Sequence, residues 1–146
     1  MKLGFIGCGN MASAMIGGII AKGLYKAEDI IVSDALEASL QKARTELKVN
    51  TTSDNKEVVA KAEIIVLSVK PQFYEEVIEE INKEAAKQGI RQNILLEVNI
   101  GEEASKSGFR SEDILPILDK ASEFPNICIK GLMAIPPISH NSGENL

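Results

Sequence analysis

The chain is poor in the residues on which metal centres and many catalytic sites depend. It has no tryptophan, one histidine and two cysteines among 146 residues. Cys8 and Cys128 are too few for a disulfide framework, and His140 lies in a polar stretch. No spacing of cysteine and histidine indicates zinc. We therefore expect no bound metal and two reduced thiols.

The chain also lacks a basic cluster and a long apolar run. Its formal net charge is −5, which disfavours nucleic acid as a partner. The longest apolar runs, such as Ile64–Val69, are too short to cross a bilayer. No secretory leader pattern follows Met1. These features predict a protein that binds neither nucleic acid nor membrane. The few, reduced cysteines suit a cytoplasmic setting, and we expect a monomer or homodimer.

What the chain does have is an alternation of strand-like and helix-like segments, typical of an α/β domain. Strands are predicted over residues 3–6, 29–33, 64–69, 94–100 and 127–135, and residues 50–53 are read as a turn. Helices are predicted over residues 11–22, 36–47, 54–61 and 72–87, and from Ser111 onward. The expected fold is a single doubly wound domain, Rossmann-like or flavodoxin-like. Its five-stranded parallel sheet has the order 3-2-1-4-5, with helices on both faces.

A glycine-rich turn follows the first predicted strand and carries the strongest functional signal. Gly7, Gly9 and Ala12 form the pattern G-x-G-x-x-A, which is typical of dinucleotide phosphate binding. The amides of Asn10, Met11 and Ala12 then open a helix that faces the anion. The Asn10 side chain has two interpretations, a phosphate contact or a helix cap.

The end of the second predicted strand bears on the choice of cofactor. Asp34 stands where an acid accepts from the ribose 2′-hydroxyl, which favours NAD, although a turn residue is an equal interpretation. Ser33 can instead help hold a 2′-phosphate, so NADP stays open. Lys70 either reaches a cofactor phosphate or ribose, or is an exposed lysine at a strand end.

Residues 1–80 resemble the nucleotide-binding domain of pyrroline-5-carboxylate reductase. The matching segments are Gly4–Ala12, Ile16–Gly18, Val32–Asp34 and Val69–Gln72. The resemblance implies that the glycine turn holds the pyrophosphate of NAD(P)H. It also implies that Val69, Lys70 and Pro71 line the nicotinamide half of the cleft.

Residues from about 82 to 141 resemble an interior part of the pyridoxal-phosphate homeostasis proteins, which are (β/α)8 barrels. The matching segments are Leu95–Ile100, Glu102–Gly108 and Gly131–Pro137. The cofactor lysine and phosphate loops of that family have no counterpart here, so pyridoxal phosphate is not expected. Lys106 is interpreted as a solvated loop charge, and Asn99 and Met133 as packing residues.

Together the two resemblances suggest an engineered chimera. Residues 1–80 would derive from a Rossmann domain and residues 81–141 from a barrel, with 142–146 a tag remnant. This interpretation predicts no catalytic activity and weak NAD(P) binding at most, and a natural fusion or truncation is the other origin considered. The alternative functions are a pyrroline-5-carboxylate reductase-like oxidoreductase and a pyridoxal-phosphate-binding protein.

Overall fold

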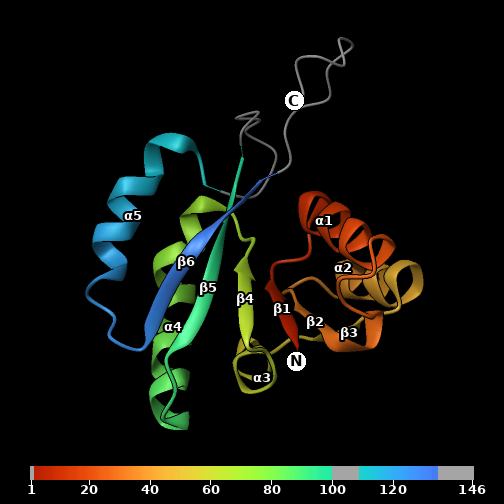
Figure 1. Ribbon diagram of the computed structural model, residues 1–146, viewed down its shortest axis with the longest axis horizontal. Coiled ribbons are helices and arrows are strands. Elements are labelled where there is room, and N and C mark those ends of the chain that lie inside the picture. The colour runs from red at the N-terminus through yellow and green to blue at the C-terminus, as the bar shows by residue number, and fades with distance from the viewer. Residues whose placement is uncertain (1, 100–108, 135–146) are drawn as a thin grey trace.

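A single parallel sheet forms the centre of the computed structural model, which describes residues 2–99 and 109–134. The strand order is β3-β2-β1-β4-β5-β6, and every neighbouring pair is parallel (Figure 1). The strands are β1 (Leu3–Ile6), β2 (Ile30–Ser33), β3 (Asn50–Thr52), β4 (Ile64–Leu67), β5 (Gln92–Val98) and β6 (Ile127–Ala134). The predicted doubly wound Rossmann-like fold is confirmed.

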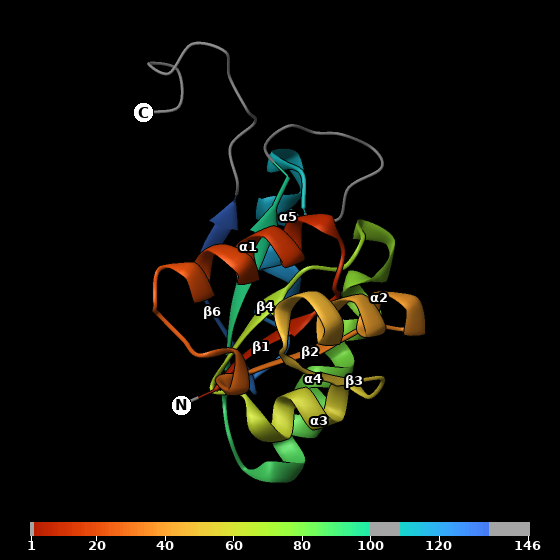
Figure 2. The same ribbon diagram turned by 90° about the vertical axis from the view of Figure 1, so that its right-hand side faces the viewer.

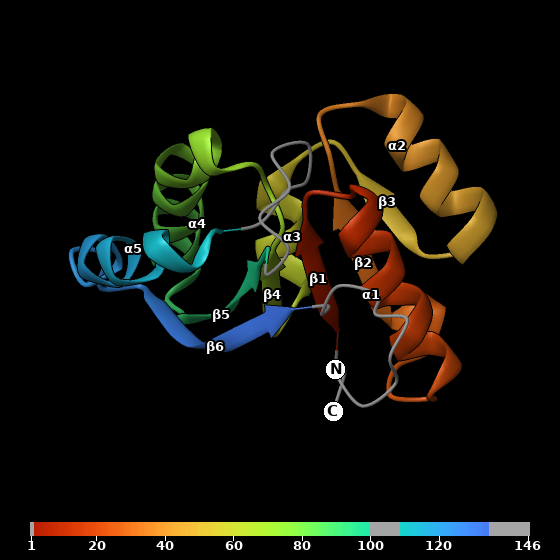
Figure 3. The same ribbon diagram turned by 90° about the horizontal axis from the view of Figure 1, so that it is seen from above.

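Helices cover both faces of the sheet. They are α1 (Asn10–Ala21), α2 (Glu37–Lys42), α3 (Asn55–Lys61), α4 (Tyr74–Gln88) and α5 (Ile114–Ala121). The shorter helical segments are the 3-10 helices η1 (Ala27–Asp29), η3 (Pro71–Phe73) and η4 (Ser111–Asp113) and the π-helix η2 (Ala43–Leu47). Seen from above, α1 and α2 lie on one side of the sheet and α4 and α5 on the other (Figure 3). The side view in Figure 2 shows α1 and α2 in front of the strands, toward the viewer.

One strand was missed by the sequence prediction. Residues 50–53, read as a turn, contain β3, which pairs with β2 at the edge of the sheet. The run 64–69, counted as the third strand beside the second, is β4, and it pairs with β1 and β5. Three polar residues, Asn50 to Thr52, carry no apolar alternation, so their pairing comes from the sheet and not from local propensity.

Most boundaries agree with the predictions within a few residues. Gly23 and Gly89 follow α1 and α4 with positive φ, and Asp54 caps α3 through Lys56 N–H. Pro116 lies in the first turn of α5, where it is tolerated because the first amides of a helix have no partner within the helix.

Two predicted segments lie outside the described residues. They are the loop 101–108, which includes Lys106, and the segment 135–146, which includes His140 and the expected tag remnant.

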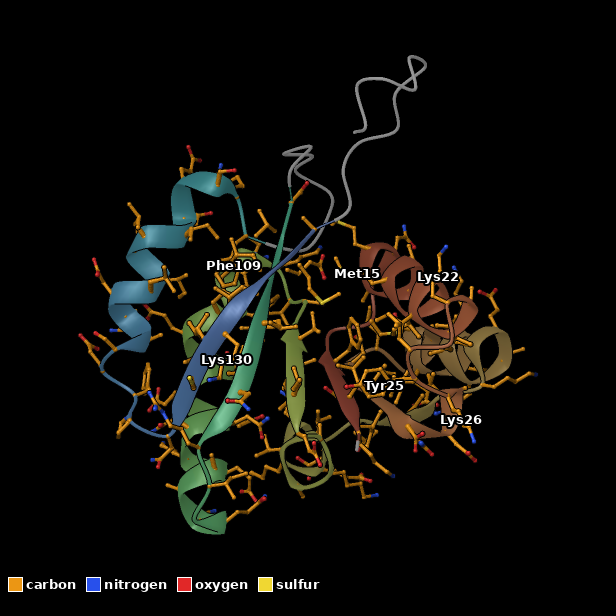
Figure 4. All side chains as sticks on the ribbon, viewed as in Figure 1. Met15, Lys22, Tyr25, Lys26, Phe109 and Lys130 are labelled. Atoms are coloured by element: carbon orange, nitrogen blue, oxygen red, sulfur yellow. The ribbon has the colours of Figure 1, made fainter. Side chains whose placement is uncertain are left out.

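Two apolar clusters hold the helices on the sheet. One lies under α3, α4 and α5 and includes Ile65, Ile81, Leu96 and Phe109. The other lies under α1 and α2 and includes Phe5, Met15 and Leu40. Figure 4 shows Met15 and Phe109 in these separate regions. In the described part of the chain, no helix is long and apolar enough to cross a membrane.

Candidate functional site

The glycine turn leaves β1 in a conformation that needs glycine. Gly7 has a φ of 99°, and a Cβ added there would lie 2.5 Å from the carbonyl oxygen of Ser68. The Gly7 N–H donates to the carbonyl oxygen of Ser33 at 2.8 Å. The turn is therefore packed tightly between the ends of β4 and β2, which explains the first glycine of the motif.

Asp34 connects this turn to the turn after β2. Its Oδ2 accepts from the Cys8 backbone N–H at 2.8 Å, and its Oδ1 accepts from the Leu36 backbone N–H at 2.9 Å. Beside it, the buried Ser33 hydroxyl donates to Oδ1 of Asn55 at 2.6 Å. The loops at the carboxyl ends of three strands are thus joined by polar contacts.

A cleft of about 620 Å³ opens beside these loops. It is lined by Ile6, Gly7, Cys8, Gly9, Ser33, Asp34, Ala35, Leu36, Ser39, Asn55, Ser68, Val69, Lys70, Phe73, Glu76 and Val77. Crossovers leave β1 and β4 toward opposite faces, so the cleft lies at the switch point where ligands bind in such sheets. Its size falls within the range of small-molecule sites.

The structure brings most of the predicted site residues together. Gly7, Gly9, Ser33, Asp34, Val69 and Lys70 all line the cleft. Asn10, Met11, Ala12 and Pro71 do not line it; Met11 and Ala12 belong to α1 and are buried in its apolar cluster, and Pro71 begins η3. The helix-cap interpretation of Asn10 is wrong, because Gly9 holds the N-cap position and Asn10 is the first helical residue.

Several lining residues were not predicted from the sequence. Phe73 and Val77 form an apolar wall from η3 and α4, and Ala35, Leu36 and Asn55 add the opposite side. Asn55 follows β3 closely, so recognising that strand would have indicated it, because residues after parallel strands gather at one sheet edge.

Cys8 is not an activated nucleophile. Burial raises the pKa of the Cys8 thiol above its ordinary value, and the nearby Asp34 carboxylate raises it further. A hydrogen bond with Ser13 and the charge of Lys42 only partly oppose these effects. At neutral pH the thiol stays protonated, so the cleft is suited to binding a ligand and not to thiolate chemistry.

Comparison with known proteins places this chain in a family of oxidoreductases. The family described as NADP oxidoreductase, coenzyme F420-dependent, matches residues 2–90. Pyrroline-5-carboxylate reductase 3 of Danio rerio is 34% identical over 146 residues, which is 99% of this chain and 48% of that protein. The chain spans less than half the length of the first curated relatives it matches.

Two further similarities match the resemblances found in the sequence. A pyrroline-5-carboxylate reductase from Coxiella burnetii has a TM-score of 0.58 and 33% identity, covering 66% of this chain and 36% of that one. A pyridoxal phosphate homeostasis protein of Aquifex aeolicus is 41% identical over 63 residues, covering 43% of this chain and 28% of that protein. Both family resemblances are therefore confirmed.

These findings correct the interpretation of the whole chain. The prediction of an engineered chimera without catalytic activity is wrong, because one reductase aligns along 99% of the chain, through the supposed junction after residue 80. The prediction that the chain is not an enzyme is wrong for the same reason, since the matching family and the reductase relatives are oxidoreductases. A nicotinamide dinucleotide is confirmed as the cofactor at the level of the family.

Proposed function

Because the chain belongs to the family described as NADP oxidoreductase, coenzyme F420-dependent, we propose that it is the nucleotide-binding part of a pyrroline-5-carboxylate reductase-like enzyme. The observation that carries the proposal is the cleft at the switch point, lined by Gly7, Gly9, Asp34 and Lys70. The donor set fits a dinucleotide: a glycine turn, a helix N-terminus and a cation surround an otherwise apolar cleft.

The pyrophosphate would face the start of α1. The first amides of a helix have no partner within the helix, and they carry partial positive charge. The Cys8 N–H already donates to Asp34, so the amides that follow Gly9, those of Asn10, Met11 and Ala12, are the ones assigned to the phosphates. Lys70, exposed at the cleft, would add a positive charge.

NADPH is the cofactor we propose in preference to NADH. The case for NAD rested on Asp34 as an acceptor for the ribose; each of its oxygens already accepts one backbone N–H group, which leaves fewer acceptor positions for a ribose hydroxyl. Ser39, which also lines the cleft, can donate to a 2′-phosphate. The family description, which names NADP, supports the same choice.

The nicotinamide ring would lie against Val69, Phe73 and Val77, which line the cleft. When bound, the reduced cofactor supplies a hydride to the carbon of a C=N bond, and the nitrogen takes a proton, which gives an amine. Apolar side chains here orient the ring and keep water from its face. The substrate class that this chemistry favours is a cyclic imine such as pyrroline-5-carboxylate.

Fluorescence titration with NADPH tests the binding step, because a chain without tryptophan gives a low background. We expect saturable binding that is lost in Gly9→Asp, where a carboxylate would meet the pyrophosphate. Gly18→Asp is the matched control, since Gly18 lies exposed on α1 with nothing within 4 Å of an added Cβ. Absence of binding at millimolar NADPH would overturn the proposal.

Activity is tested by following NADPH oxidation with and without pyrroline-5-carboxylate. Imine-dependent oxidation that disappears in Gly9→Asp but not in Gly18→Asp would show that this chain also binds the substrate. Cofactor binding without imine-dependent oxidation would restrict the function of this chain to holding the dinucleotide.

Gel filtration at several protein concentrations tests the expected monomer or homodimer.

A further inference from the structure

The Asp34 carboxylate spans two turns that are far apart in the chain. Its two oxygens accept from Cys8 N–H at 2.8 Å and Leu36 N–H at 2.9 Å, one donor for each oxygen. Cys8 belongs to the glycine turn after β1, and Leu36 is the N-cap residue of α2. We call this pair of contacts the Asp34 bridge.

The Asp34 bridge continues a row of contacts between β1 and β2. Ile6 and Ser33 are the last register partners of these strands, and Gly7 N–H then donates to the Ser33 carbonyl oxygen at 2.8 Å. Cys8 N–H comes next and has no strand residue opposite it, because the chain after Ser33 turns toward α2. The Asp34 side chain supplies the acceptor that the backbone no longer offers.

We propose that Asp34 is a positioning residue that fixes the glycine turn in the shape needed to receive a pyrophosphate, a role that rests on the proposed function. Hydrogen bonds from N–H to a carboxylate are roughly twice as strong as neutral ones, so the bridge holds both turns firmly. The two donors also offset the negative charge of Asp34, which would otherwise repel a phosphate beside it.

This role differs from a direct contact with the adenosine ribose. A ribose contact affects only ligands that contain adenosine, and it leaves the ligand-free protein unchanged. A positioning role alters the glycine turn before any ligand arrives. It also weakens ligands that have a phosphate but no adenosine, such as reduced nicotinamide mononucleotide.

Amide hydrogen exchange in the ligand-free protein is the first test. In Asp34→Ala we expect the Cys8 amide to exchange about tenfold faster or more, as loss of a charge-assisted hydrogen bond implies. Asp34→Asn keeps the size but offers one acceptor in place of two, and it serves if the alanine variant does not fold. Asp29→Asn, which removes the same charge at the amino end of β2, is the matched control.

Ligand binding is the second test. We expect Asp34→Ala and Asp34→Asn to weaken NADPH and reduced nicotinamide mononucleotide by a similar factor of about ten, while Asp29→Asn changes neither. Unchanged Cys8 exchange overturns the inference, and so does a loss confined to NADPH. If the unaltered protein binds no cofactor, the proposed function fails, and a role of Asp34 in cofactor binding fails with it. The exchange rate of the Cys8 amide is independent of any ligand, so it still decides whether Asp34 holds the glycine turn.

Discussion

The two halves of the sheet, β3-β2-β1 and β4-β5-β6, are built differently. In the half with the glycine turn, β1 and β2 are four residues long and wholly buried, and their ends are joined by polar contacts to Ser33 and Asp34. On the other side, β5 and β6 have seven and eight residues, and β6 alternates toward solvent at the sheet edge. In Figure 3, among residues 2–99 and 109–134, no helix covers β6 on the face of the sheet where α1 lies.

The strands of the first half position the loops of the cleft, and the strands of the second half stabilise the fold. The short strands end early, so their loops gather at one edge and form the cleft. The long strands contribute apolar area to the cluster under α4 and α5, and they line no part of the cleft. We therefore expect changes on the β5 side to alter stability alone, and changes in the glycine turn to alter both stability and binding.

The largest loss of stability is expected for Leu96→Ala. Leu96 is fully buried between β4 and β6, and its removal leaves a cavity in the apolar cluster. The free energy of unfolding should fall by about 2–5 kcal/mol. Urea unfolding measures this loss, and NADPH affinity of the folded fraction should stay unchanged.

Leu132 is the matched control for this comparison. It is the register partner of Leu96 on β6 but is 54% exposed, so Leu132→Ala should cost less than about 1 kcal/mol. Equal losses at the two positions would show that β6 is as well covered as β5, and the contrast between the two sides would be lost.

Gly7→Ala should reduce both stability and cofactor binding. The added methyl would lie 2.5 Å from the Ser68 carbonyl oxygen at a φ of 99°, so the turn must move, at a cost of about 1–3 kcal/mol. Gly23→Ala is the control, since Gly23 also has a positive φ but has nothing within 4 Å of an added Cβ. Thermal unfolding and NADPH titration of both variants measure the difference; a Gly7→Ala protein with full affinity contradicts the prediction.

Tyr74→Phe should stabilise the protein slightly. The Tyr74 hydroxyl is buried and has no hydrogen-bond partner among the described residues, so its removal relieves a desolvation cost of about 1 kcal/mol. Urea unfolding at pH 7 measures the gain. A loss of stability in the variant would indicate that the hydroxyl has a partner.

The same variant gives a pH dependence with a definite sign. Burial, and then the charges of Glu97 and Asp113, raise the pKa of Tyr74 well above its ordinary value of 10.0. Above pH 10 the unfolded chain therefore loses this proton first, and the wild-type free energy of unfolding falls by at most about 1.4 kcal/mol per pH unit. Below pH 9 the contribution is constant, so the difference between Tyr74→Phe and wild type should widen only in alkali.

Local sequence patterns predicted the elements that carry strong periodicity. The apolar run 64–69 and the helical spacing over residues 72–87 both correspond to observed elements, β4 and α4. The strand β3 was missed because its polar residues pair only where β2 presents an edge. Order along the sheet depends on such long-range pairing, which a local pattern does not contain.

The candidate site, like the fold, was predictable from the sequence only in part. The motif placed Gly7 and Gly9 at the cleft, because the glycine pattern encodes a backbone conformation. The partners of Asp34 were not predictable, since Cys8 lies 26 residues away and donates through its backbone, which leaves no trace in residue type. Phe73 and Val77 were missed because the same apolar residues also predict a helix facing the core.

The smallest expected effect concerns α3, the helix of the crossover that links the two sides. Lys61 Nζ lies 2.8 Å from Glu57 Oε2 in an i,i+4 pair on the exposed surface of this helix, and hydrogen bonds from Lys61 and Thr52 lower the pKa of Glu57. Lys61→Met should cost about 0.3–0.5 kcal/mol at neutral pH and low salt, because solvent screens such a pair. The lowered pKa means that this stability is present above the ordinary titration range of glutamate and is lost as the pH falls through the folded value. Urea unfolding at pH 7 and pH 3 measures both values; a difference that persists at pH 3 or in 1 M salt would assign the effect to lost packing of the lysine side chain.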